Sequence, residues 1–208
     1  MNSRNKLSKE KIELLTDEKI EQYLVDYVVN DVIKEQWDEQ YKLVMSLPEP
    51  IRVNYITFML EGEISNGGYG QYFFNSSGIF AYDAVDALKI IGASKKADIT
   101  KKALLKITQN KLSKAEYIEL QKNRELIENV DKKVIKKRGD KLSQHEYWWS
   151  ILQEYSEDMD EFDDAFYDNS EDLTKLRVKY LRRNMNKFSL DKGNLNFLKR
   201  FLYSKFRI

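Results

Sequence analysis

The sequence predicts an all-α protein, a single multi-helix bundle over residues 1–208. Apolar residues recur at helical spacing along almost the whole chain. No segment shows the alternation of apolar and polar residues that is typical of a half-buried strand. The chain also holds only two prolines and eight glycines, so few positions interrupt a helix and long linkers are not expected.

The N-terminal part, residues 1–45, is expected to form a helical extension. Its apolar periodicity predicts one long helix or two shorter ones over residues 17–46. Pro48 and Pro50 end that segment, because proline lacks a backbone donor and restricts the residue before it. A second helix is expected over residues 51–64.

The next segment, residues 61–78 (EGEISNGGYGQYFFNSSG), holds five of the eight glycines and places three amides among four aromatic residues. In a structural interpretation, Asn66-Gly67-Gly68 closes one helix, a short helix follows, and the flanking amides satisfy the free backbone groups of a tight turn. In a functional interpretation, Asn66, Gln71 and Asn75 surround a pocket, since amides both donate and accept hydrogen bonds. The structural interpretation is favoured.

The rest of the chain continues the helical pattern. Helices are expected over residues 80–91, 95–108, 113–129 and 171–184, with a basic C-terminal helix within residues 185–208. Gly92 ends the first of these. Ser113 with Glu116 three residues later forms a capping-box pattern. Asn169 and Ser170 offer N-caps for the helix over residues 171–184.

The net charge of +1 hides an acidic block beside a basic one. Residues 154–172 contain ten acids and no lysine or arginine, and the residues after 172 contain eleven bases and one acid. As one helix of about 28 Å, the acidic block would approach the charge density of one DNA strand. On such a helix the apolar residues form one stripe: Leu152, Tyr155, Met159, Phe162 and Phe166. The opposite side is expected to bind a basic partner through Glu157, Asp160, Glu161, Asp164 and Asp168.

Two other interpretations of the acidic block remain open. It is an ordinary solvated helix face if Arg177, Arg182 and Arg183 of the following helix neutralise it, and a helix break at Asn169-Ser170 would interrupt the straight acidic row. Metal binding by clustered aspartates is the other, although no ordered ligand spacing is present. The basic C-terminal segment has an apolar stripe that explains it as an amphipathic helix, so direct nucleic-acid binding is not expected.

No catalytic residue, metal site or cofactor is expected. His145 is the only histidine and has no second histidine four residues on, so a packing role is favoured over zinc binding. No nucleophile elbow, phosphate loop or dinucleotide fingerprint occurs. The absence of cysteine, of a secretory signal in residues 1–10 and of a long apolar run predicts a cytoplasmic protein that does not enter a membrane.

Three motifs carry a family resemblance over residues 50–184, the family-like core. They are the segment 61–78, the pattern Ala84-x-x-Ala87-Leu88-x-x-Ile91-Gly92-Ala93, and Phe162-Asp163-x-x-Phe166-Tyr167 followed by Asp172-Leu173 and Tyr180-Leu181. They resemble a bacterial family of domains of unknown function named after a DNA-mimic protein. The resemblance implies a mostly helical fold and, for the founding member, a dimer that occupies the DNA-binding surface of a transcription regulator.

The expected function is therefore that of a non-enzymatic interaction protein. It would present its acidic helix face to a basic partner such as a DNA-binding regulator or a nuclease, and a homodimer follows from the resemblance. The alternative is a small-ligand-binding protein or enzyme with its pocket at Asn66, Gln71 and Asn75. The chain departs from the family pattern in charge, because a DNA mimic is strongly acidic overall and this chain is nearly neutral.

Overall fold

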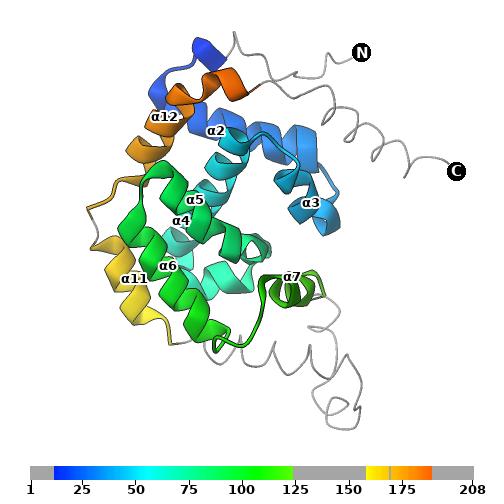
Figure 1. Cartoon of the computed structure of the whole chain (residues 1–208). Coiled ribbons are helices and arrows are strands. Elements are labelled where there is room, and N and C mark those ends of the chain that lie inside the picture. Colours follow the sequence, from blue (N-terminus) through cyan, green and yellow to red (C-terminus); the bar gives the residue numbers. More distant parts are fainter. Residues whose placement is uncertain (1–11, 124–157, 169, 189–208) are drawn as a thin grey trace, which may run out of the picture. The chain divides into compact units, whose positions relative to one another are not determined.

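The computed structural model describes residues 12–123, 158–168 and 170–188, and every element in these ranges is helical (Figure 1). The predicted all-α class is confirmed. The chain separates into two compact units, one made of the residues up to 58 and from 172 onward, the other of residues 59–171. We call them unit 1 and unit 2. The organisation of residues 1–208 as a single domain stays a prediction.

Unit 1 begins with the segment for which one long helix or two shorter ones were expected. Its elements are α2 (Asp17–Tyr27), the π-helical η1 (Val28–Ile33), the 3-10 turn η2 (Trp37–Glu39) and α3 (Gln40–Met45). The break falls at Lys34, whose φ of 53° is outside the right-handed helical region. The next helix, α4 (Glu49–Phe74), starts around Pro50, which is tolerated there because first-turn N–H groups have no partner within the helix.

The last α-helix described in unit 1 is α12 (Leu173–Arg183), which packs against α2 (Figure 1). The prediction that Asn169 or Ser170 caps this helix is wrong. The cap is Asp172, whose side chain accepts a hydrogen bond from the N–H of Lys175 at 3.0 Å. Asp172 takes this role because it stands directly before the first helical residue, where a carboxylate reaches the third N–H of the helix.

Unit 2 contains the end of α4 and the helices that follow it. These are η3 (Ser76–Phe80), α5 (Ala81–Ile91), α6 (Ser94–Ile107), α7 (Lys114–Lys122) and α11 (Asp160–Tyr167). Gly92 ends α5 with a φ of 93°, and Ser113 and Glu116 form the predicted capping box. The core is strongly aromatic, with buried side chains at Tyr69, Tyr72, Phe73, Phe80, Tyr117 and Phe166.

Several expectations lie outside the described residues. They are the N-terminal residues 1–11, the part of the helix over 113–129 beyond residue 123, the segment with His145, Glu157, Asn169, and the C-terminal helix beyond residue 188. Among the helices that are described, none combines the length and apolarity needed to cross a membrane.

Candidate functional site: the glycine kink and the acidic helix

Helix α4 is interrupted at Gly67 and Gly68. Gly67 has φ −165° and ψ 28°, and Gly68 has φ 74° and ψ −175°. The second combination belongs to a region that is essentially open to glycine alone. The expected stop at this sequence is therefore present as a kink, with a positive φ at Gly68 only. The kink leaves the N–H of Tyr69 without the acceptor that a continuous helix provides.

The carboxylate of Asp163 supplies that acceptor. Its Oδ1 receives the N–H of Tyr69 at 2.7 Å, although Asp163 lies on α11. A Cβ atom placed on Gly68 would lie 2.8 Å from Cγ of Asp163, so the glycine also makes room for the carboxylate. Burial raises the pKa of Asp163, the Tyr69 N–H lowers it, and the neighbouring Asp160 and Asp164 raise it further.

The C-terminal end of α11 is also fixed. The Tyr167 hydroxyl donates to the carbonyl of Ile64 at 2.6 Å. The buried amine of Lys96 donates to the carbonyl of Phe166 and lies 3.9 Å from the centre of its ring. A cation at this position complements the negative end of the helix dipole, while burial lowers the pKa of Lys96. Helix α11 is therefore held at its middle and at its C-terminal end.

The amides of segment 61–78 converge on the carboxylate of Glu63. Gln71 and Asn75 each donate to Glu63 Oε2 at 2.7 Å, and the Ser77 hydroxyl donates to Oε1 at 2.9 Å. Asn66 donates to the side-chain oxygen of Gln71 at 3.1 Å. The amides thus bind a side chain rather than the free backbone groups expected from the sequence. This network ties the residues on the two sides of the kink together.

This geometry bears on the predicted ligand pocket at Asn66, Gln71 and Asn75. All three side chains lie in one place, as expected, but each donates a hydrogen bond to another side chain of the same segment. Hydrogen-bonding groups that are already satisfied have less to offer a ligand. The contacts favour the structural interpretation of the segment.

The acidic block is not one continuous helix. Helix α11 has eight residues, Asp160–Tyr167, which corresponds to about 12 Å rather than the expected 28 Å. It starts after Met159, whose φ of −115° and ψ of 0° lie outside the helical region, and it ends at Asp168. The prediction of an unbroken nineteen-residue row is therefore wrong, because the chain leaves the helical conformation on both sides.

Half of the ten acids are used within the molecule. Lys106 of α6 forms ion pairs with Asp158 at 3.0 Å and Glu161 at 3.2 Å. Asp163 binds the Tyr69 N–H, and Glu171 accepts the N–H groups of Lys95 and Lys96 at the start of α6. The fifth is Asp172, the cap of α12. Helices α6 and α11 lie side by side (Figure 1), and Lys106 of α6 can therefore reach acids at the start of α11.

Three acids remain exposed and pair with no described residue: Asp160, Asp164 and Asp168. We call them the acidic strip. Their spacing of four residues puts Asp160 and Asp164 on one helix face, with Asp168 following at the C-cap. Arg177 and Arg182, two of the arginines expected to neutralise the block, instead pair with Glu21 and Asp17 of unit 1.

Three residues of the site escaped the sequence analysis: Glu63, Asp163 as an anchor, and Lys106. Glu63 and Asp163 lie within the family-like motifs, and this position could have marked them as residues of the site. Nothing in the sequence marks Lys106, because its partners are more than fifty positions away. The described residues contain no group of three or more histidines and acids arranged to hold a metal ion.

The fold and site define an all-helical protein whose short acidic helix is anchored on a glycine kink. The family model described as DMP19-like protein matches residues 45–184, which is more than half of the chain. The chain therefore belongs to the DMP19-like family, named for DNA mimic protein 19, as the resemblance indicated. No curated protein and no solved structure matches the chain.

Proposed function

We propose that this chain is a non-enzymatic, cytoplasmic interaction protein that uses α11 to cover a basic surface of a partner protein. The partner is a DNA-binding regulator or a nuclease whose phosphate-binding residues meet Asp160, Asp164 and Asp168. Glu161 and Glu157 belong to the same proposed surface. Membership of a family named for a DNA mimic supports this class of function.

The acidic strip is the observation that carries the proposal. Two exposed carboxylates lie on α11 and a third at its C-cap, and no described cation neutralises them. The hydrogen bonds of Asp163, Tyr167 and Lys96 hold the helix in place. A fixed set of charges loses less conformational freedom on binding than a mobile one, which favours recognition.

The near-zero net charge does not oppose this function. At physiological salt, charges separated by more than about 8 Å are largely screened from each other. A partner docked on α11 therefore responds to the carboxylates it faces rather than to the charge of the whole chain. The proposal concerns a local anionic surface, smaller than that of a protein that is acidic throughout.

The test is affinity capture from a native bacterial lysate with the full chain as bait, at low and high salt, with duplex DNA added as a competitor. We expect basic proteins to be retained at low salt and to be released by both salt and DNA, because DNA and the acidic strip compete for one surface. Asp160→Asn with Asp164→Asn should abolish capture.

The control is Asp86→Asn with Asp98→Asn, which removes the same charge from exposed positions on α5 and α6. It should leave capture unchanged. Equal loss in both double variants, or partners that duplex DNA does not displace, would overturn the proposal. Light scattering of the same bait tests the homodimer that the family resemblance implies.

A further inference from the structure

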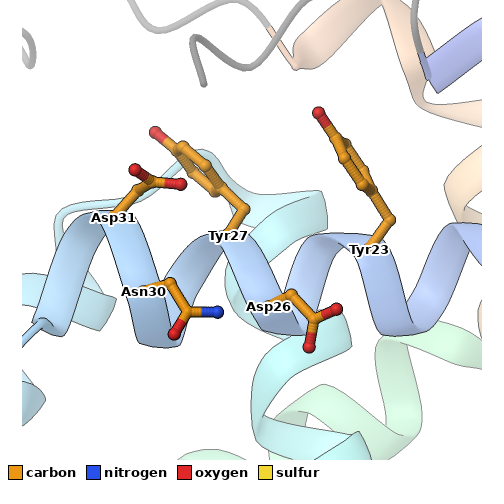
Figure 2. A pocket seen from close by; sticks show the side chains of 5 residues that line it. All are labelled: Tyr23, Asp26, Tyr27, Asn30 and Asp31. Atoms are coloured by element: carbon orange, nitrogen blue, oxygen red, sulfur yellow. The ribbon is translucent and has the colours of Figure 1, made fainter. Parts of the chain in front are cut away.

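A second site lies in unit 1, on α2 and η1. A pocket with a volume of about 260 Å³ opens on the last turns of α2 and on η1, lined by Tyr23, Asp26, Tyr27, Asn30 and Asp31 (Figure 2). This volume is below the range of about 300–1,000 Å³ of drug-sized ligand sites, and it suits a single side chain. Neither the proposed function nor the family match accounts for it.

The chemistry of the lining is that of a cation site. Tyr23 and Tyr27 stand next to each other along the helix, and Asp31 lies beside the phenol ring of Tyr27 (Figure 2). The described lining residues include two carboxylates and no basic group. Asp31 projects on the same side of the helix as the two tyrosines, whereas Asp26 projects on the other side (Figure 2). No described residue forms an ion pair with Asp26 or Asp31. Gln22 donates to one oxygen of Asp26 at 2.8 Å, which orients that carboxylate.

The backbone of this site is unusual as well. Residues 28–33 form a π-helix, with the N–H of Lys34 bonded to the carbonyl of Val29 at 2.8 Å. Such turns are frequent at functional sites because they change the direction of side chains within a helix. The surrounding stretch, residues 17–39, carries eight acids and two lysines. Arg182 and Arg177 pair with two of these acids, Asp17 and Glu21, and the stretch still has more acids than cations around the pocket.

We propose that this pocket binds the guanidinium group of an arginine on a partner polypeptide. A planar guanidinium stacks on tyrosine rings and forms paired hydrogen bonds with carboxylates, whereas an ammonium group is a compact, strongly hydrated charge. A peptide arginine fits better than the free amino acid, because the α-carboxylate of free arginine would be repelled by Asp26 and Asp31.

The test titrates the full-length protein with the blocked peptide acetyl-Gly-Arg-Gly-amide, followed by backbone amide NMR shifts. The shifts should concentrate in residues 23–31. The isosteric but neutral citrulline peptide should bind at least ~10-fold more weakly, and the lysine peptide and free arginine should also bind more weakly than the arginine peptide. Equal binding of the citrulline peptide, or shifts located elsewhere, would overturn the assignment.

Variants separate the contribution of the carboxylate charges from that of stacking on the tyrosine ring. Asp26→Asn with Asp31→Asn removes the charge and should weaken binding at least ~10-fold. Tyr27→Phe keeps the ring and should bind within about twofold of the parent, whereas Tyr27→Leu should lose binding. Comparing Tyr27→Phe with Tyr27→Leu tests whether the arginine peptide binds in this pocket, even if the double aspartate variant does not fold. Equal binding by Tyr27→Leu and the parent contradicts the site.

The same titration distinguishes this site from the acidic strip. Asp160→Asn with Asp164→Asn should leave the affinity for the arginine peptide unchanged, since neither residue lines the pocket. A comparable loss in that variant would mean that the peptide binds α11, and the pocket assignment would fail while the proposed function of α11 stood.

Discussion

The carboxylate of Asp163 accepts a hydrogen bond from the backbone N–H of Tyr69 at 2.7 Å, across 94 positions of sequence. This contact joins the glycine kink in α4 to the acidic helix α11. It turns one acid of the block into an anchor and leaves the acidic strip on the exposed side. The first three predictions concern this connection.

Gly68→Ala should strongly destabilise the protein. Alanine rarely adopts the conformation of Gly68, and its Cβ would meet the Asp163 carboxylate. We expect a loss of about 2–4 kcal/mol in the free energy of unfolding, measured in urea. Gly62→Ala is the matched control, because nothing lies within 4 Å of a Cβ there. It should stabilise α4 by about 0.5–1 kcal/mol, and equal effects at the two glycines would contradict the explanation.

Asp163→Asn tests the pH dependence of the anchor. The pKa of Asp163 is raised in the folded protein, so the folded state holds its proton more tightly than the unfolded chain. The contribution of this group is fully present below its unfolded pKa of about 3.9 and is lost as the pH rises through the folded value. The stability of the parent relative to Asp163→Asn should therefore fall as the pH rises from about 3.5. A flat difference in urea titrations would contradict the prediction.

Glu63→Gln should destabilise the kink through its three donors. The substitution turns one acceptor into an amide that faces Gln71, Asn75 or Ser77, at a cost of about 1–3 kcal/mol. Gln71→Ala removes one of the same hydrogen bonds, so the two changes should be non-additive by at least about 0.5 kcal/mol. The measurement is a double-mutant cycle by urea denaturation. Asp86→Asn, an exposed acid on α5, is the control and should have little effect.

Arg177→Ala should be among the most destabilising changes in unit 1. The Arg177 side chain is buried, pairs with Glu21, and donates to Thr174 at 3.2 Å. Leaving the Glu21 carboxylate without its partner should cost about 3–5 kcal/mol in the free energy of unfolding. Arg177→Met combined with Glu21→Leu should recover most of this loss, since no buried charge remains. If the double variant recovers no stability, the unpaired Glu21 carboxylate is not the cause of the destabilisation in Arg177→Ala.

Lys106→Ala tests the internal neutralisation of the acidic block. Removing this lysine releases the exposed carboxylates of Asp158 and Glu161 and should have little effect on thermal unfolding. Capture of basic proteins at low salt should increase, because the anionic surface of α11 grows. Lys102→Ala on the same helix is the control, since its exposed side chain forms no ion pair with a described residue. Decreased capture in Lys106→Ala would contradict the proposal that the acidic side of α11 binds a basic partner.

The order and limits of most helices were predictable because they depend on neighbours in the chain. Gly92 ends α5, and Ser113 and Glu116 cap α7, through contacts that span only a few residues. The glycine pair in α4 marked a break for the same reason. The π-helical turn after Tyr27 and the break at Lys34 left no comparable signal, because their backbone angles are fixed by packing rather than by residue type.

By itself, the sequence determined an all-helical chain, the position of its kink and the family to which it belongs. Each of these depends on residues close together in the chain: helical periodicity predicts the helices, the glycine pair predicts the kink, and the order of residues in the motifs indicates the family. Only the tertiary structure decided which acids remain available to a partner. Lys106 neutralises two of them, Asp163 becomes an anchor, and Asp160, Asp164 and Asp168 stay exposed. Charges pair with whatever group the fold brings within a few ångströms, and that distance does not follow from separation along the chain.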